Sequence, residues 1–270
     1  MSIWLNGQLA ETISLADRGL AYGDGVFETM KVVDGKIPLL DWHWQRLLNS
    51  CQRLQIPLDI RLLQAELDSF LSTQADLDFT CKLIITRGLG QRGYAQPKPC
   101  LPNRILLASA SPVWPSSYAE EGICLFECQT ALARQPLLAG IKHLNRLEQV
   151  LARNEWQDSK YAEGLMRDTQ GWVIEGVFSN IFCVINGCLV TPDLSDSGVE
   201  GVRRQQILDL AKMHALSYKV AKLSLSDLAQ ASEVFMCNSS YGIWPVREFS
   251  TQHWLVGPIT RKLQRLIEYK

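Results

Sequence analysis

The chain has 270 residues, of which 47% are hydrophobic and 20% charged, as in an ordinary globular protein. Its formal net charge is −1 and it has no run of Lys or Arg, which argues against a general nucleic-acid-binding protein. No apolar stretch approaches the roughly 18 residues of a membrane span, and the first residues lack the basic and apolar regions of a secretory signal. We therefore expect a cytoplasmic protein that binds neither nucleic acid nor a membrane.

Three short pairs of residues predict tight turns between strands. They are Asn6-Gly7, Asp34-Gly35 and Asn186-Gly187, and each lies between two apolar segments. Both residues of such pairs adopt the positive φ of a two-residue hairpin turn at little cost. The sequence therefore predicts one hairpin at each pair.

Helical spacing of apolar residues marks four further segments, over residues 41–54, 144–151, 202–210 and 258–269. Asp41 is expected to cap the first of these helices, and Pro57 follows its end. The second is expected to begin directly after Lys142, and the third directly after Gly201. Pro258 suits the first turn of the last helix.

A stretch rich in Pro and Ser, residues 108–117, predicts a domain boundary. We expect a smaller N-terminal α/β domain over residues 1–111, a linker over 112–118 and a larger C-terminal domain over 119–270. Hairpins are predicted in both halves, so the sheets should be largely antiparallel with flanking helices. The expected fold class is α+β.

Generic motifs do not identify a chemistry. The sequence contains no GxGxxG after a strand, no phosphate-binding P-loop, no GxSxG and no HExxH. It has eight cysteines, but none forms a CxxC pair, and no histidine stands at ligand spacing from another candidate. We expect reduced thiols and no metal site.

Six longer segments, in order, carry a specific resemblance. They are DRGLAYGDGVFE (17–28), HWQRL (43–47), RGLGQRGY (87–94), LAGIKHLNRLE (138–148), EGVFSN (175–180) and FMCNSSYGIWPV (235–246). Together they resemble the fold-type IV family of enzymes that use pyridoxal 5'-phosphate (PLP), also called the class-IV aminotransferase family. Within that family, the segments 87–94 and 138–148 are most similar to the aminodeoxychorismate lyases.

The resemblance implies a two-domain fold like that of D-amino-acid aminotransferase, with PLP bound by the C-terminal domain. Lys142 would be the catalytic residue, forming a Schiff base with PLP and moving the substrate proton. Glu175 would face the pyridine nitrogen, and Ser179 and Asn180 belong to the same motif. The expected phosphate ligands are Arg46, Val202, Arg203 and Ser239, the middle two mainly through their backbone at a helix start. The expected substrate contacts are Thr29, Arg92 and Tyr94.

The activity that the resemblance implies is the conversion of 4-amino-4-deoxychorismate to 4-aminobenzoate and pyruvate, in folate biosynthesis. An aminotransferase acting on D-amino or branched-chain acids remains the alternative, because Phe27-Glu28-Thr29 is closer to the transaminases at Glu28. A non-catalytic PLP-binding protein on the same fold is a further alternative. The family is generally homodimeric, so we expect a homodimer whose ligand is a small molecule.

Overall fold

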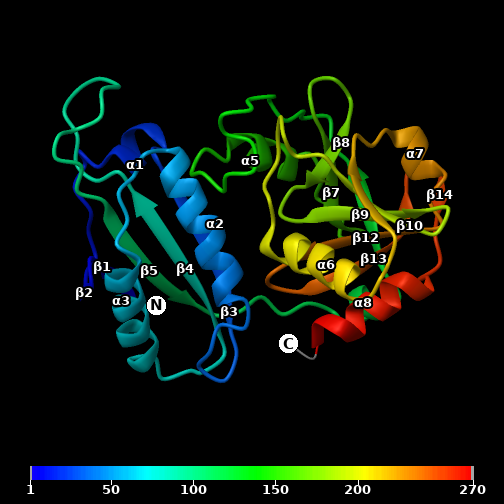
Figure 1. The fold of residues 1–270 in the computed structure, drawn as a ribbon, viewed down its shortest axis with the longest axis horizontal. Coiled ribbons are helices and arrows are strands. Elements are labelled where there is room, and N and C mark those ends of the chain that lie inside the picture. The colour runs from blue at the N-terminus through cyan, green and yellow to red at the C-terminus, as the bar shows by residue number, and fades with distance from the viewer. Residues whose placement is uncertain (1, 269–270) are drawn as a thin grey trace. The chain divides into compact units, whose positions relative to one another are not determined.

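The computed structural model describes residues 2–268, and contacts divide this chain into two units (Figure 1). Unit 1 takes the chain up to Pro112 together with Ile141–Asn145. Unit 2 takes Val113–Gly140 and the chain from Arg146 onward. The short segment that carries Lys142 therefore groups with unit 1, although the sequence assigned it to the C-terminal domain.

Unit 1 contains a five-stranded antiparallel sheet in the order β2-β1-β5-β4-β3. Its strands are β1 Ile3–Leu5, β2 Gln8–Leu9, β3 Gly25–Val32, β4 Phe79–Thr86 and β5 Asn103–Ser109. Its helices are α1 Arg18–Tyr22, α2 Leu40–Arg53 and α3 Ile60–Ser72. Helices α2 and α3 lie over one face of the sheet (Figure 1), where their apolar side chains share one core with those of β3, β4 and β5.

Unit 2 contains a nine-stranded sheet in the order β11-β10-β9-β12-β13-β6-β7-β8, with β14 paired to β13. An additional pairing of β8 with β9 closes part of this sheet on itself. Its strands are β6 Ile123–Glu127, β7 Tyr161–Arg167, β8 Val173–Gly176, β9 Asn180–Ile185, β10 Cys188–Pro192, β11 Tyr218–Ala221, β12 Glu233–Asn238, β13 Gly242–Phe249 and β14 Gln252–His253. Most pairings are antiparallel; those of β6 with β7, β6 with β13 and β10 with β11 are parallel.

The helices of unit 2 are α4 Ser117–Glu120, α5 Leu147–Arg153, α6 Val202–Met213, α7 Leu225–Ala229 and α8 Pro258–Glu268. Helices α6 and α8 pack on one face of the sheet, where Ile207 and Leu263 meet Phe182 and Phe235. A second apolar cluster lies among β6, β13 and the segment around α7. None of the helices between residues 2 and 268 has the length and apolar character of a membrane span.

The three predicted turns are present, and their residues have the positive φ that the sequence predicts. Asn6 and Gly7 have φ of 53° and 80°, and Asn186 and Gly187 have φ of 50° and 75°. These pairs join β1 to β2 and β9 to β10. The Asp34-Gly35 pair closes a bridge between Val33 and Lys36.

Two of the helix predictions were wrong at their starts. Helix α2 begins at Leu40 and has no side-chain cap, so Asp41 lies inside its first turn instead of capping it. The helix expected directly after Lys142 begins only at Leu147, because Leu144 donates its N–H to the carbonyl of Gly25 on β3. By contrast, α6 follows Gly201 and α8 starts at Pro258, as predicted.

Candidate active site

Lys142 lies on a short extended segment that pairs with the start of β3. Its carbonyl accepts a hydrogen bond from the N–H of Phe27 at 3.0 Å, and His143 forms an antiparallel bridge with Val26. Gly25 makes this approach possible, since a Cβ there would lie 2.9 Å from Leu144 Cδ1 and 2.4 Å from a backbone oxygen of β4. The backbone of Lys142 is therefore fixed independently of its side chain.

The side chain of Lys142 lies against an aromatic ring of β3. Its Nζ is 4.5 Å from the centre of the Phe27 ring. Side chains alternate along a strand, so Thr29 shares the Phe27 face of β3, whereas Glu28 points to the opposite, helix-covered face. The predicted substrate residue Thr29 is thus on the same face as the ring that the Lys142 amine touches.

Glu28 forms a buried cluster with two residues of α2. Its carboxylate accepts hydrogen bonds from Arg46 Nε at 2.8 Å and from Arg46 Nη2, and it meets His43 Nδ1 at 2.6 Å. The side chains of Glu28, His43 and Arg46 are only 1%, 1% and 10% exposed. Arg46 was predicted as a phosphate ligand; because one edge of its guanidinium binds Glu28, a phosphate would have to meet the opposite edge.

Burial and the neighbouring charges determine the protonation states of Glu28 and His43. Burial acts to raise the pKa of Glu28, but the charges and hydrogen bonds of Arg46 and His43 outweigh it and lower that pKa to about 2. Burial lowers the pKa of His43, and the positive charges of Arg46 and Lys142 lower it further against the opposing effect of Glu28. Glu28 is therefore an anion at neutral pH, and His43 is a neutral ring that donates from Nδ1.

In unit 2, Glu175 at the end of β8 is held by two donors. Its Oε2 accepts from the N–H of Val199 at 2.8 Å and from Asn180 Nδ2 at 3.4 Å. Asn180 Nδ2 also donates to the Val199 carbonyl at 2.8 Å. Gly140 pairs with this same loop, donating its N–H to Gly198 O at 2.9 Å, and Lys142 follows Gly140 by two residues in the chain.

The start of α6 adjoins this motif. A Cβ on Gly201 would lie only 1.9 Å from Asn180 Oδ1, so the helix start fits against Asn180 only with glycine there. Val202 and Arg203 occupy the first two helical positions, where backbone N–H groups have no acceptor within the helix. Positive partial charge at such an end favours an anion.

The guanidinium of Arg203 is largely withdrawn from water. It donates to Asn238 O at 3.4 Å and to Gln206 Oε1, and burial lowers its pKa. Within residues 2–268 no carboxylate forms an ion pair with Arg203, so its charge is suited to a bound anion. Asn238 ends β12, and the predicted phosphate residue Ser239 follows it in the turn to β13.

Ser179, predicted to belong to the cofactor motif, binds a buried carboxylate through its hydroxyl. Its hydroxyl donates to Glu163 Oε2, a carboxylate of β7 that has no exposed surface. Burial raises the pKa of Glu163 to about 7, although Ser179 and three backbone N–H groups act to lower it. The Ser179 hydroxyl is thus bound to the buried Glu163 carboxylate of β7.

The predicted substrate residues Arg92 and Tyr94 lie on the long connection between β4 and β5. Both side chains are exposed, Tyr94 by 86%. Arg18 of α1 holds this loop by donating to the carbonyls of Gly93 and Tyr94, and the rings of Tyr22 and Tyr94 are 5.5 Å apart. These contacts hold the loop against α1.

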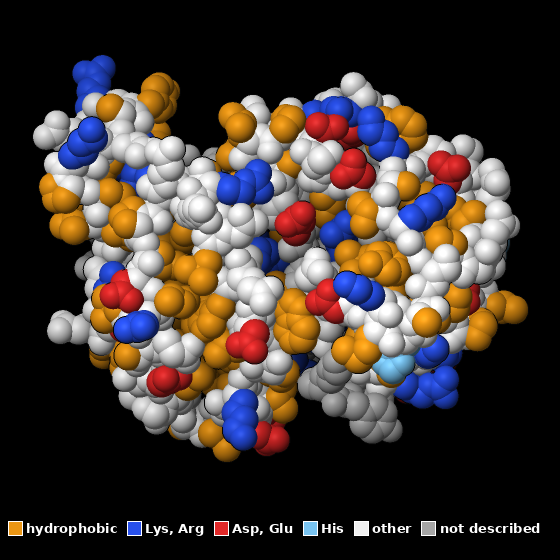
Figure 2. Space-filling model, viewed as in Figure 1, with side chains coloured by type: hydrophobic (Ala, Val, Ile, Leu, Met, Phe, Trp, Pro, Cys, Tyr) orange, Lys and Arg blue, Asp and Glu red, His pale blue; other side chains and the backbone are white. Residues whose placement is uncertain are grey.

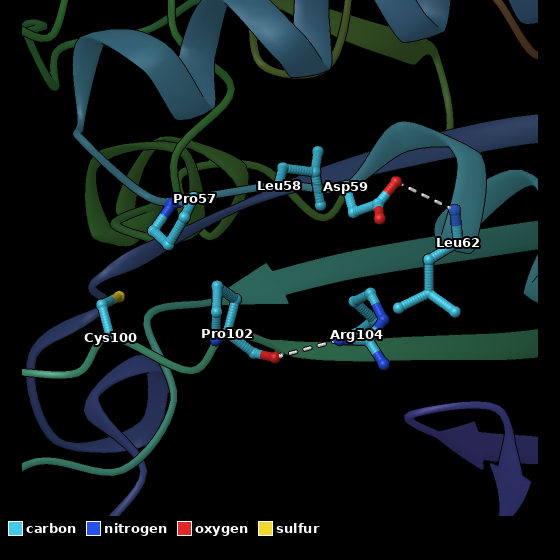
Figure 3. A pocket seen from close by; sticks show the side chains of 7 residues that line it. All are labelled: Pro57, Leu58, Asp59, Leu62, Cys100, Pro102 and Arg104. Carbon is cyan, nitrogen blue, oxygen red and sulfur yellow. Dashed lines mark hydrogen bonds between the residues drawn. The ribbon is translucent and has the colours of Figure 1, made fainter.

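A separate cavity of about 320 Å³ opens in unit 1 between the start of α3 and the start of β5 (Figure 3). Its lining residues are Pro57, Leu58, Asp59, Leu62, Cys100, Pro102 and Arg104. Asp59 already accepts from the N–H of Leu62, and Arg104 pairs with Glu66. No residue predicted for the site lines this cavity, and its charged groups are already engaged.

Sequence reasoning missed charged residues that lie within the recognised motifs of each unit. Asp24 of the first motif binds both Arg18 at 2.8 Å and Arg87 at 2.7 Å, which ties that motif to the end of β4. Arg146, four residues after Lys142, lies within electrostatic range of Glu175, whose charge raises its pKa against the larger lowering effect of burial. Only the position of these residues inside recognised motifs could have identified them.

Comparisons with known proteins show the family to which the chain belongs. The family model described as Amino-transferase class IV matches residues 25–249. The chain is 37% identical over 267 residues to the aminodeoxychorismate lyase of Vibrio harveyi, covering 97% of each chain. It is 28% identical over 281 residues to a D-alanine aminotransferase of Bacillus licheniformis, covering 99% of this chain and 96% of the relative.

Among solved structures, the chain is similar to 4-amino-4-deoxychorismate lyase from Pseudomonas aeruginosa. The two share 50% sequence identity with a TM-score of 0.97, covering 99% of this chain and 98% of the other. The chain therefore belongs to the class IV aminotransferase family, which confirms the predicted resemblance and the α+β fold class.

Proposed function

We propose that this chain is a PLP-dependent lyase that converts 4-amino-4-deoxychorismate to 4-aminobenzoate and pyruvate, a step of folate biosynthesis in the cytoplasm. The observation that carries the proposal is the near full-length likeness to the P. aeruginosa lyase. The sequence around Lys142, which is closest to the lyases, supports the same conclusion.

The described residues fit the two charged ends of PLP. The start of α6 and the partly buried charge of Arg203 complement a phosphate dianion. Glu175, fixed by Val199 and Asn180, offers a carboxylate to a protonated pyridine nitrogen. When bound, PLP supplies an electron sink for the carbanion that forms at the substrate carbon.

Lys142 would do the proton chemistry. Its Nζ is the group that takes the proton from the carbon bearing the substrate nitrogen. Loss of the enolpyruvyl group then makes the six-membered ring aromatic, which drives the reaction. Glu175 would hold the protonated ring nitrogen of PLP, since Val199 and Asn180 donate to its Oε2 and keep the carboxylate in place.

The second candidate is an aminotransferase. It is favoured by Glu28, which resembles the transaminases in its sequence context, and by the D-alanine aminotransferase relative. Both candidates use the same lysine and cofactor, but a transaminase requires a keto acid to complete its cycle. The two therefore differ in whether one substrate is sufficient.

A single-substrate assay tests the proposal. With PLP and enzymatically generated aminodeoxychorismate, 4-aminobenzoate and pyruvate should form in equal amounts without any keto acid. A coupled assay for pyruvate and fluorescence of 4-aminobenzoate would measure both products. Amino-group transfer to an added keto acid, without 4-aminobenzoate, would replace the lyase by the aminotransferase.

We also propose a homodimer, supported by the surface of α5. Leu147, Val150 and Leu151 share this helix and are 53% to 75% exposed, although their spacing is that of a buried face. Figure 2 shows hydrophobic side chains at the surface in the region of α5. Apolar residues gathered on one exposed helix are typical of an interface.

Introducing charge on α5 should weaken this dimer. The double variant Val150→Glu with Leu151→Glu is expected to sediment as a monomer at concentrations where the wild type is dimeric, because two carboxylates would be desolvated at the interface. Leu255→Glu is the matched control, since Leu255 is 89% exposed outside this helix. Equal dimerisation of all three proteins would place the interface elsewhere.

A further inference from the structure

We propose that Glu163 is a positioning residue, which holds the turn between Glu175 and Asn180 and so sets where both side chains point. This inference rests on the proposed function only in assigning Glu175 and Asn180 to the cofactor. The arrangement of the turn itself is a property of unit 2.

The turn folds around the Glu163 carboxylate. Glu163 Oε1 accepts from the N–H of Val177 at 3.0 Å, and Oε2 accepts from the N–H of Phe178 at 3.4 Å and from the Ser179 hydroxyl. A fourth donor is the N–H of Gly164, at 2.9 Å from Oε1. Three consecutive residues of the turn thus bind one carboxylate.

The turn is also closely packed on that carboxylate. Gly176 donates its N–H to the carbonyl of Ser179 at 2.6 Å, which closes the loop. A Cβ on Gly176 would lie 2.9 Å from Glu163 Cδ and 2.6 Å from Ser179 Oγ. There is consequently little space for the turn to move toward β7 while Glu163 is in place.

Glu175 and Asn180 stand at the two ends of this turn. Glu175 precedes Gly176, and Asn180 follows Ser179 as the first residue of β9. The two residues pair across β8 and β9, and their side chains are joined by the 3.4 Å hydrogen bond. A displaced turn would therefore move the carboxylate that faces the cofactor and the amide that steadies it.

The contacts use both oxygens of residue 163 as acceptors, which the ionised carboxylate provides above its pKa of about 7, so the variants are compared at pH 8. All four groups around it donate, so a glutamine would bring its NH₂ against at least one donor and leave that donor without an acceptor. Glu163→Gln changes this hydrogen bonding while nearly keeping the volume of the side chain. It is therefore the most direct substitution.

A matched control exists in the same unit. Glu233 of β12 is 4% exposed, and it accepts from the N–H of Ile259 at 3.1 Å and from the N–H and hydroxyl of Thr260, both at 2.7 Å. It holds the start of α8 just as Glu163 holds the turn. Glu233→Gln should therefore disturb unit 2 to a similar degree without affecting residues 175–180.

The experiment measures backbone amide exchange and PLP affinity on the full-length protein. Glu163→Gln should speed exchange at Val177 and Phe178 and weaken PLP binding about tenfold to a hundredfold, because a buried donor loses its acceptor. Glu233→Gln should speed exchange at Ile259 and Thr260 and leave PLP affinity at the wild-type value. Wild-type exchange at the turn in Glu163→Gln, or equal loss of PLP affinity in both variants, would overturn the proposal.

A second variant keeps the proposal testable if Glu163→Gln does not fold. Ser179→Ala removes one donor and leaves the carboxylate, so it should speed exchange at Phe178 less than Glu163→Gln does. If Glu163→Gln does not fold, unchanged exchange at the turn in Ser179→Ala would overturn the proposal. Amide exchange is measured without PLP, so it tests the role of Glu163 in the turn independently of the proposed function. A wild-type protein that binds no PLP would refute the proposed function, and the exchange rates would still decide the role of Glu163.

Discussion

Replacing Lys142 by alanine is expected to abolish lyase activity, with a loss of more than about 10⁴-fold, while the protein stays folded. In the proposed mechanism one amine both anchors the cofactor and moves the proton, so removing it removes both steps. The fold should survive because the hydrogen bond of Lys142 to β3 is made by its backbone carbonyl, which alanine keeps.

A second lysine provides the control for this variant. Lys82 of β4 is exposed, and its Nζ lies 5.1 Å from the centre of the same Phe27 ring, compared with 4.5 Å for Lys142. Lys82→Ala removes an ammonium from the same aromatic ring without touching the proposed chemistry. It should retain near wild-type turnover.

Borohydride distinguishes the two lysines directly. Reduction of the PLP-loaded wild type and of Lys82→Ala should attach the cofactor permanently to the peptide containing Lys142, as measured by mass spectrometry. Lys142→Ala should yield no labelled peptide. Turnover in Lys142→Ala, or labelling of a different lysine, would show that the catalytic amine is assigned wrongly.

The parts of the fold that the sequence predicted depend on local patterns. The Asn-Gly turns and the start of α6 are determined by backbone preferences within a few residues. The helix predicted at Leu144 failed because residues 142–144 pair with β3, more than 110 residues earlier in the chain. A local pattern contains no information about such a distant strand partner.

The same difference between local patterns and distant contacts applies to the candidate site. Lys142, Glu175 and Arg203 were predicted as site residues from the family resemblance, and the structure places each on a fixed backbone element. Arg46 and Glu28 were not recognised as partners, because Arg46 lies off the apolar stripe of its helix and Glu28 is a charge in an apolar strand. Their pairing depends on α2 covering one face of β3, which is a tertiary contact.

Breaking the Glu28–Arg46 pair is expected to have the largest effect on stability. Glu28→Ala and Arg46→Ala should each lower the free energy of unfolding by about 3–5 kcal/mol, because each removes one member of a buried ion pair. The double variant should cost clearly less than the two single variants together. Urea unfolding of the four proteins would measure this coupling.

The Arg104–Glu66 pair of the same unit is the control. Arg104 Nε and Nη2 bind the two Glu66 oxygens at 2.7 and 2.8 Å, but these side chains are 17% and 9% exposed. The geometry matches that of Glu28 and Arg46, whereas water reaches this pair more readily. Its coupling energy should be smaller, and an equal or larger value would contradict the argument from burial.

The free energy of unfolding should depend on pH through Glu28, because this residue has a folded-state pKa of about 2 against an ordinary value of 4.5. A lowered pKa stabilises the folded state above about pH 4.5, and that stabilisation is lost as the pH falls from 4.5 toward 2. The difference corresponds to about 3 kcal/mol. Glu163 acts in the opposite sense: its pKa of about 7 destabilises the folded state at higher pH and is relieved as the pH falls from 7 to 4.5. The free energy of unfolding is measured from pH 8 to pH 2.5. Glu28→Ala should lose the decrease below pH 4.5, and Glu163→Gln should lose the change between pH 7 and 4.5. An unchanged decrease below pH 4.5 in Glu28→Ala would show that another carboxylate is responsible.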